Sequence, residues 1–361
     1  MKIIIAPDSF KGSLSAVQVC DIIGARLSET FPGAEIVKIP IADGGEGTLD
    51  CFAEIVNGER IACEVTGPNF RKVAAEYLLC GDLAVIESAQ ANGLPLANPK
   101  SAKDTTTYGV GELIAHASDN GAQKFIIGIG GSATNDGGCG MAAALGTRFL
   151  DKNGKEFVPV GASLCDIAEI EFGEKYDITV LCDVTNPLCG ENGAAYVYAR
   201  QKGATDEDTA MLDSGLKHLS GVLGRYGINI SDMRGAGAAG GMGAGFSAFT
   251  GAELKRGIDT VLDLINFDSL AESADFIITG EGALDSQSFS GKVIDGIISR
   301  SHSAPVLAAV GISKIENPSD YGLTAVFESN ENHRPCEQVL PRAEEDLAEC
   351  ARKLARFIES F

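Results

Sequence analysis

"IIIAPDSFKGSLSA", residues 3–16, contains a short apolar run, a polar turn and the beginning of a second apolar segment. This order predicts a buried strand that ends near residue 6 and a helix that starts near Ser13 or Ser15, because serine is favoured at a helix N-cap. The turn between them holds Asp8 and Lys11, an acid and a cation, close together. A strand, a turn and a helix in this order are typical of an α/β protein.

The rest of the chain repeats this alternation of short apolar runs and segments with helical periodicity. Such an alternation predicts a parallel sheet that is covered by helices. We expect strands over residues 2–6, 35–41, 124–129, 177–182, 275–279, 305–310 and 323–328. We expect helices over residues 13–29, 47–56, 105–120, 137–148, 205–225, 238–252, 290–301 and 341–360.

Residues 59–90 depart from this pattern, because the runs "ERIACEVTG", "RKVAAEYLLC" and "DLAVIESA" follow one another with only short polar breaks. This spacing predicts an antiparallel meander. The chain of 361 residues is also longer than a single hydrophobic core usually grows. We therefore expect two α/β domains. Residues 1–58 with 255–361 form one with a parallel sheet, and residues 59–254 form an inserted domain with a mixed sheet.

Charge and cysteine content exclude several classes of protein. The chain has 29 Lys and Arg against 50 Asp and Glu, a formal net charge of −21, whereas binding to a nucleic-acid backbone needs a basic face. Its ten cysteines are scattered and form no CxxC pair, which is typical of a reduced protein. We find no secretory signal and no apolar run of spanning length. The sequence predicts a cytoplasmic protein without nucleic-acid or membrane partners.

Five apolar runs end in polar segments of one kind, rich in glycine, acids and hydroxyls. In open α/β sheets, ligands bind outside the carboxyl ends of the strands, so these segments predict one lined cleft. They read "IIIAPDSFKGS", "IVKIPIADGGEGT", "FIIGIGGSATNDGG", "ITVLCDVTNPLCG" and "FIITGEGALDSQSFSGK".

Phosphoryl transfer is the chemistry that fits this combination of residues. It uses backbone N–H groups around phosphates, carboxylates that hold Mg²⁺, a cation against developing charge and an acid that accepts a hydroxyl proton. The five segments supply all four types, with Lys11 and Lys292 among them. The sequence has no GxxxxGK[ST] motif, so a P-loop is excluded.

The segment "GAGAAGG", residues 235–241, matches GxGxxG, and Asp259 follows at a distance that suits a dinucleotide fingerprint. The residues before it form a poor strand, however. The segment could open a helix that binds nucleotide phosphates, or its glycines could let helices approach closely. The four histidines lie outside the five segments, which disfavours a hydrolytic triad and a zinc site.

With these residues assembled, the sequence resembles the bacterial glycerate kinases of the first type, almost from end to end. The resemblance implies transfer of the ATP γ-phosphate to D-glycerate with Mg²⁺, giving 2-phosphoglycerate rather than 3-phosphoglycerate. It also implies a flavodoxin/Rossmann-like domain and a restriction-endonuclease-like domain, with the active site in the cleft between them. The matching motifs are "APDSFKGSLSA", "ADGGEGT", "GIGGSATNDGG", "GMAAALG", "DVTNPLCGENGAA", "QKGA", "GAGAAGGMGAG" and "GEGALDSQSFSGK".

Glycerate is small and anionic, so we expect its carboxylate to meet a cation and the N–H groups of a helix start. Lys11, Ser9 and the amides of Gly12 and Ser13 are the residues expected for this task. The wider set of expected substrate contacts adds Asp43, Gly44, Gly45, Asn135 and Asp136.

Asp183 is the expected catalytic base, because it follows a strongly apolar strand within "CDVTNP". Asp43 and Asp285 are expected nearest to Mg²⁺. Lys11, Asp8 and Lys292 complete the expected catalytic group. The sequence offers more carboxylates than the reaction needs, Glu46 among them, and several of these serve as caps or turn formers.

The expected contacts to ATP come from glycine-rich loops and nearby polar residues. Spacing does not identify the loop that takes the phosphates, and "GIGGSATNDGG" could instead be a purely structural turn. The expected residues are Gly130, Gly131, Ser132, Thr134, Gly138, Gly237, Gly240, Gly241, Gly243, Glu281 and Lys292.

Two other functions compete with this interpretation. A nicotinamide-dependent hydroxy-acid dehydrogenase would use residues 235–240 as its dinucleotide loop, but it needs a preceding strand and a base such as histidine in the cleft. A nucleotide- or metabolite-sensing protein would bind the same ligands without turnover. The expected partners are in either case small molecules, and the sequence leaves a homodimer open.

Overall fold

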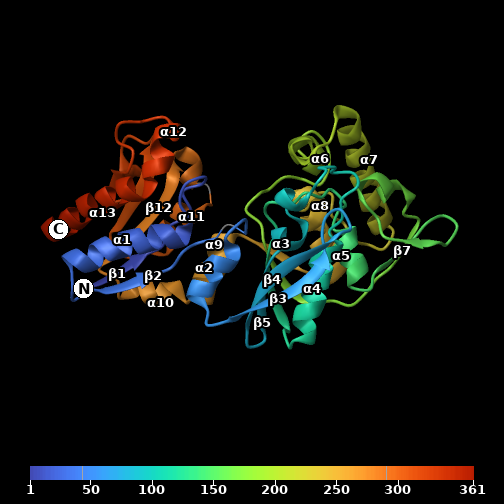
Figure 1. Ribbon diagram of the computed structural model, residues 1–361, viewed down its shortest axis with the longest axis horizontal. Coiled ribbons are helices and arrows are strands. Elements are labelled where there is room, and N and C mark those ends of the chain that lie inside the picture. The colour runs from blue at the N-terminus through green and yellow to red at the C-terminus, as the bar shows by residue number, and fades with distance from the viewer. Residues whose placement is uncertain (43, 290) are drawn as a thin grey trace. The chain divides into compact units, whose positions relative to one another are not determined.

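The computed structural model describes residues 1–42, 44–289 and 291–361, and the chain forms two compact units (Figure 1). Unit 1 consists of Met1–Asp43, Asp50–Val56 and Arg256–Phe361, and unit 2 of Gly44–Leu49 and Asn57–Lys255. The expected domain boundaries after residues 58 and 254 stay a prediction. The sequence did not indicate that Gly44–Leu49 belongs with unit 2.

Unit 1 is built on a five-stranded sheet with the order β14-β13-β12-β1-β2, in which every pairing is parallel. The interior strand β1, between β12 and β2, is fully buried at Ile3, Ile4 and Ile5, which explains its uninterrupted apolar run. All five strands were expected, and β12 and β13 extend further than their apolar cores suggested. The strands are β1 (Lys2–Ile5), β2 (Glu35–Lys38), β12 (Phe276–Leu284), β13 (Val306–Ser313) and β14 (Ala325–Glu328).

Two long helices of unit 1, α1 (Ala16–Thr30) and α13 (Ala343–Ser360), pack side by side against the sheet (Figure 1). Helix α1 starts after Ser15, whose hydroxyl accepts from the Gln18 amide in a capping box, so the serine signal located the start correctly. The other helices of the unit are α2 (Thr48–Ile55), α9 (Gly257–Leu264), α10 (Phe267–Glu272), α11 (Val293–Arg300) and α12 (Cys336–Val339).

Unit 2 is built on a six-stranded mixed sheet with the order β11-β10-β6-β5-β4-β3. The antiparallel meander predicted over residues 59–90 is confirmed by β3 (Glu59–Thr66), β4 (Lys72–Cys80) and β5 (Leu83–Glu87). Strand β5 then pairs in parallel with β6 (Lys124–Gly128), which joins the meander to the parallel half of the sheet. The remaining strands are β10 (Asp177–Leu181) and β11 (Glu253–Lys255).

A small antiparallel sheet in unit 2 was not expected from the sequence. It consists of β7 (Arg148–Leu150), β8 (Glu156–Phe157) and β9 (Glu169–Glu171). Strands of two or three residues are too short to show a period of their own.

Helices surround the larger sheet of unit 2, and two of them differ from the expectation. The helix expected over 137–148 is confined to α5 (Cys139–Ala144), because Gly146 adopts a φ of +88°. The helix expected over 238–252 is interrupted in α8 (Ala238–Gly245), where residues 239–241 have positive φ, and a π-helical turn follows. The other helices are α3 (Ala89–Asn92), α4 (Tyr108–Asp119), α6 (Ala194–Tyr198) and α7 (Asp206–Gly224). Among the described residues, no helix is long and apolar enough to cross a membrane.

Candidate functional site

The loop that leaves β6, residues 129–138, is the centre of the candidate site in unit 2, and we call it the β6 loop. It lies against the Gly44-Gly45 turn, since the Gly130 amide donates to the Gly44 carbonyl at 2.9 Å. A Cβ atom on Gly130 would lie 2.6 Å from the Gly45 Cα, so only glycine permits this approach. The segments "ADGGEGT" and "GIGGSATNDGG" therefore meet, as the sequence predicted for strand ends.

The end of β10 joins the same cluster. A Cβ atom on Gly44 would lie 2.8 Å from the Leu181 Cβ atom, so the turn also touches the last residue of β10. Asp183, the expected base, follows two residues later and is exposed. Three of the five predicted strand-end segments thus lie together in unit 2.

Asp136 anchors the β6 loop from within. Its carboxylate accepts from the Thr107 amide and hydroxyl, both at 2.8 Å, and from the Gly138 and Gly140 amides at 3.1 and 3.2 Å. The side chain is fully buried, and burial raises its pKa against the lowering effect of these donors. We therefore infer that Asp136 supports the loop. Its neighbour Asn135 stays the expected substrate contact.

The glycines of residues 235–245 bring protein backbone close to the β6 loop. A Cβ atom on Gly240 would lie 2.0 Å from the Thr134 carbonyl oxygen, and one on Gly241 would lie 3.0 Å from the Gly137 Cα. Added Cβ atoms on Gly237 and Gly243 would meet backbone carbonyl oxygens at 2.2 and 2.5 Å. The contacts of these four glycines favour the packing interpretation over a loop that wraps phosphates.

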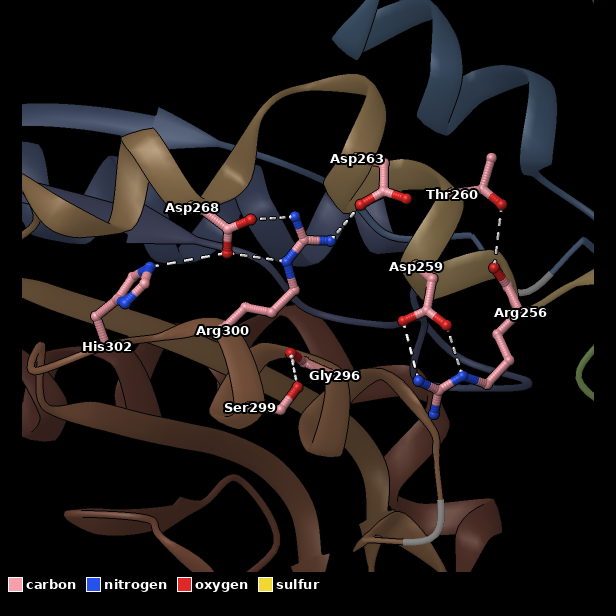
Figure 2. A network of polar contacts seen from close by, with 9 residues as sticks. All are labelled: Arg256, Asp259, Thr260, Asp263, Asp268, Gly296, Ser299, Arg300 and His302. Carbon is pink, nitrogen blue, oxygen red and sulfur yellow. Dashed lines mark hydrogen bonds and ion pairs between the residues drawn. The ribbon is translucent and has the colours of Figure 1, made fainter.

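The dinucleotide interpretation of the same segment fails on two further observations. Within the described part of the chain, no strand precedes Gly235, because residues 226–234 form turns and irregular backbone. Asp259, whose spacing suited the dinucleotide fingerprint, forms an ion pair with Arg256 at 2.7 Å (Figure 2). The dehydrogenase alternative is therefore not supported.

Figure 2 also shows how the helices of unit 1 that follow Arg256 are held together. The Arg300 guanidinium on α11 binds both carboxylate oxygens of Asp268 on α10, at 3.0 and 2.5 Å, and Asp263 on α9 at 2.6 Å. This network links three helices and fixes α11, whose N-cap residue is Lys292.

Lys202 is a functional candidate that the sequence analysis missed. It lies on the 3₁₀ turn Arg200–Lys202 with only 2% of its surface exposed, and its Nζ atom donates to the Ser132 Oγ at 2.9 Å and the Thr134 carbonyl at 2.8 Å. Burial lowers the pKa of Lys202 to about 7, and the nearby Asp136 opposes this shift. Lys202 is the lysine of the motif "QKGA", which the sequence analysis noted only as one of the motifs that resemble the glycerate kinases.

Several polar groups around the β6 loop are buried without a partner among the described residues. These are both amide atoms of Asn135, the Asn92 Oδ1 and the Ser88 Oγ. Buried polar groups in folded proteins are nearly always satisfied by protein, water or ligand, so these atoms mark positions where a ligand or water would bind. Strand β5 ends at Glu87 and Ser88 follows it, and the run "DLAVIESA" could have identified these two residues as a sixth strand end.

In unit 1, the loop after β1 lies against the carboxyl-terminal part of β12. The Asp8 amide donates to the Gly280 carbonyl at 2.8 Å, and a Cβ atom on Gly282 would lie 3.5 Å from the Phe10 Cα. The Ser9 amide donates to the Asp8 carboxylate, whereas the amide and hydroxyl of Ser13 both donate to the Phe10 carbonyl. The amide of Ser13 is therefore engaged in a tight turn, in which Gly12 has a φ of +83°, and helix α1 begins three residues later.

Glu281 is the most perturbed acid of this second cluster. Its Oε1 atom is buried without a hydrogen-bond partner among the described residues. Burial raises its pKa, while the hydroxyl of Ser288 and the charges of Lys292 and Lys11 act in the opposite direction and Asp285 adds to the increase. Perturbed carboxyl groups beside cations are typical of functional sites. Unit 1 thus brings four expected residues within electrostatic reach of one another: Lys11, Glu281, Asp285 and Lys292.

Of the two residues expected near a metal, the structure describes only Asp285. Asp43 lies outside the described residues. The Asp285 carboxylate accepts from the Gln287 amide at 2.9 Å and lies 3.9 Å from the Lys314 Nζ. Residues 1–42, 44–289 and 291–361 contain no group of three or more His, Cys, Asp or Glu side chains arranged to hold a metal ion.

Comparison with known proteins identifies the class to which these sites belong. A model of the "Glycerate kinase family" matches residues 3–359. The chain is 44% identical to the glycerate kinase of Bacillus cereus over 98% of this chain and 97% of that protein. It is 41% identical to the glycerate 2-kinase of Escherichia coli, again over 98% and 97%.

A solved structure agrees with these relatives. The crystal structure of a Salmonella typhimurium LT2 protein designated glycerate kinase 2 superposes with a TM-score of 0.86 and 41% identity, and the match covers 100% of this chain and 98% of that one. The chain is accordingly an enzyme of the transferase class, a kinase. From its residues, its fold and these relatives, the chain belongs to the glycerate kinase family.

Proposed function

We propose that this enzyme transfers the γ-phosphoryl group of ATP to the 2-hydroxyl of D-glycerate and releases ADP and 2-phosphoglycerate. The glycerate oxygen forms a bond to the γ-phosphorus, the bond from that phosphorus to the β–γ bridging oxygen breaks, and the hydroxyl proton passes to a carboxylate. Full-length similarity to glycerate kinases, one of them a glycerate 2-kinase, supports the proposal. The prediction that the reaction takes place between two domains stays a prediction.

The observation that carries the proposal is the cluster of two acids and two lysines at the ends of β1 and β12. Lys11 and Lys292 both act electrostatically on Glu281, together with Asp285. Phosphoryl transfer is catalysed mainly by positioning and by stabilisation of charge, and such a cluster supplies both signs of charge. We assign Lys11, Ser9 and the Gly12 amide to the glycerate carboxylate, and Lys292 to the negative charge that develops during transfer; Asp8 stays in the proposed catalytic group.

The residues present also fit a bound Mg²⁺ ion. Mg²⁺ is usually held by one or two protein carboxylates together with substrate phosphates and water, rather than by an all-protein cage. Among the described residues, Asp285 and the partnerless buried oxygen of Glu281 are such carboxylates. When bound there, Mg²⁺ would neutralise charge on the phosphates.

Asp183 is the residue that we propose as the base. It follows β10 and is exposed, beside the Gly44-Gly45 turn that touches Leu181. A carboxylate in this position can accept the proton of a substrate hydroxyl as phosphoryl transfer proceeds.

The proposed reaction is tested by measuring ADP formation from ATP with and without D-glycerate and Mg²⁺. We expect ADP only when both are present, and phosphorus NMR should show a signal for 2-phosphoglycerate. ADP release that does not depend on D-glycerate would contradict D-glycerate as the acceptor. A 3-phosphoglycerate signal would contradict transfer to the 2-hydroxyl. A sensing protein would bind ATP without turnover.

Lys11 lies in the loop after β1, and Lys2 lies at the amino end of that strand. The two lysines offer a matched pair of variants. We expect Lys11→Met to raise the KM for D-glycerate by about tenfold to a hundredfold, because a charge-assisted hydrogen bond is lost. Lys2, which bonds to the Ser273 hydroxyl at the amino end of the strand, should tolerate Lys2→Met without a change in KM. Steady-state kinetics of both variants check this, and equal KM values would remove Lys11 from the site.

A further inference from the structure

Lys202 is a buried cation without a carboxylate in contact. None of the ion pairs of the described residues includes it, although it is 2% exposed. A buried and unpaired charge is costly, and proteins keep such groups mainly where a ligand or a function compensates for the cost. Its two bonds are both to the β6 loop, at Ser132 and at the carbonyl of Thr134.

The direction of the bond to Ser132 determines what that hydroxyl can do. An ammonium group only donates hydrogen bonds, so the Ser132 Oγ accepts from Lys202, and its own hydrogen must point elsewhere. A hydroxyl that accepts from a cation is polarised and becomes a stronger donor. Ser132 is 6% exposed, and its Oγ atom has no other hydrogen-bond partner among the described residues.

Asn135, three residues further along the loop, provides an independent observation. The residue is fully buried, and neither its Oδ1 nor its Nδ2 atom has a partner among the described residues. The loop that carries it is held by the four hydrogen bonds to Asp136 and by the close approach of Gly240. Donor groups on so rigid a loop are already in place before a ligand binds, which reduces the entropic cost of binding.

We propose that Lys202 is a positioning residue of the kinase reaction: it orients the Ser132 hydroxyl as a donor to an anionic oxygen of a substrate and supplies charge to balance that anion. The oxygen belongs to an ATP phosphate or to the glycerate carboxylate. This inference rests on the proposed function and deepens it, because it identifies a cationic element that the glycine-rich loop itself lacks.

Binding of an anionic substrate near Lys202 should depend on pH. An anion bound near Lys202 favours the protonated amine, so binding should weaken as pH rises through about 7, the value to which burial lowers the pKa of Lys202. The charged group that acts on Lys202 is Asp136, which is buried and held by the loop. Charged side chains on the neighbouring elements pair with one another: Arg200 with Asp206, Lys103 with Asp208 and Lys217 with Asp213.

The test compares Lys202→Met, Lys202→Arg and Ser132→Ala with a control variant, Lys175→Met. Lys175 also donates to two backbone carbonyls in unit 2, those of Ala248 and Phe249, but contacts no hydroxyl. The KM values for ATP and for D-glycerate are measured separately between pH 6.5 and 9 at saturating Mg²⁺. The substrate whose KM responds identifies the source of the anionic oxygen.

In the wild type and in Lys175→Met, we expect the KM of one substrate to rise above pH 7 by up to about tenfold per pH unit. In Lys202→Met, that KM should be raised at least tenfold and lose its pH dependence. Lys202→Arg, which stays charged throughout, should also lose the pH dependence while keeping a lower KM than Lys202→Met. Ser132→Ala combined with Lys202→Met should add little to the single variants, because the two residues act as one unit.

Unchanged KM values and an unchanged pH profile in folded Lys202→Met would overturn the proposal, and so would fully additive effects of the two substitutions. Thermal unfolding of each variant shows whether it is folded. A wild type that forms no ADP with D-glycerate would refute the proposed function instead. Calorimetric titration of ATP and of D-glycerate into wild type and Lys202→Met across the same pH range would then still test Lys202.

Discussion

Single residues with unusual surroundings determine the candidate site. Lys202 and Asp136 are both buried, and both are attached to the β6 loop, one from outside and one from within. Gly240 lets a second backbone segment reach the carbonyl of Thr134. The sequence identified the loop but not Lys202, because a lysine three residues before the predicted helix 205–225 has no local signature of burial. Only the tertiary structure shows that the lysine turns inward.

Gly240 and Gly221 form a matched pair that tests this packing. Gly240→Ala should destabilise the protein by about 3 kcal/mol or more, because its Cβ would lie 2.0 Å from the Thr134 carbonyl oxygen at a φ of +73°. Gly221, in α7, has no atom within 4 Å of an added Cβ, so Gly221→Ala should stabilise by about 0.5–1 kcal/mol. Urea denaturation measures both, and similar free energies of unfolding for the two variants would contradict the packing role.

At the scale of elements, the sequence predicts best where one period dominates. The strands of unit 1 were expected from their short apolar runs, which in β1, β12 and β13 are buried on both faces, and the meander over residues 59–90 was expected from its short polar breaks. Helix α8 was expected to be continuous: Gly240 and Gly241 permit the positive φ angles found at residues 239–241, but their presence does not require them, and Ala239 gives no sign of one. Contacts with the β6 loop impose that conformation. These contacts join residues that are far apart in the sequence, so no local sequence pattern indicates them.

The network around Arg300 is an element-scale feature that can be measured. Arg300→Met should lower the free energy of unfolding by about 1 kcal/mol, since the guanidinium binds Asp268 with two hydrogen bonds and also reaches Asp263 (Figure 2). The difference should shrink in 1 M salt, which screens exposed charges. Arg26→Met, which removes an exposed pair with Glu29 within α1, should have a smaller effect. Equal effects would indicate that the network adds nothing.

At the scale of the whole molecule, the expected site residues divide between two units. Unit 1 contains Lys11, Glu281, Asp285 and Lys292, and unit 2 contains Asp183 and the β6 loop. The sequence predicted that strand ends carry the chemistry in both parts of the chain. It could not rank the carboxylates, because an acid that caps a turn and an acid that binds a ligand look alike until burial and partners are known. The pKa perturbation of Glu281 depends on burial, which only the fold provides.

Variants in the two units should therefore have different kinetic signatures. Asp183→Asn should lower kcat by about 10²- to 10⁴-fold, the usual contribution of a general base, while the Mg²⁺ concentration for half-maximal activity stays the same. Glu281→Gln should instead raise that Mg²⁺ concentration, because a carboxylate that holds the ion is lost. Steady-state rates at varied Mg²⁺ separate the two. A full rate in Asp183→Asn would show that the base lies elsewhere.

The position of β1 between β12 and β2 has a consequence for how the protein is made. Strand β1 pairs with β12, whose residues are synthesised more than two hundred positions later. The isoleucines of β1 therefore lack their second neighbouring strand until residues 57–255 have been synthesised. That segment can form its own hydrophobic core before β12 is made. During translation, the apolar side chains of β1 therefore need protection from aggregation until β12 has been made.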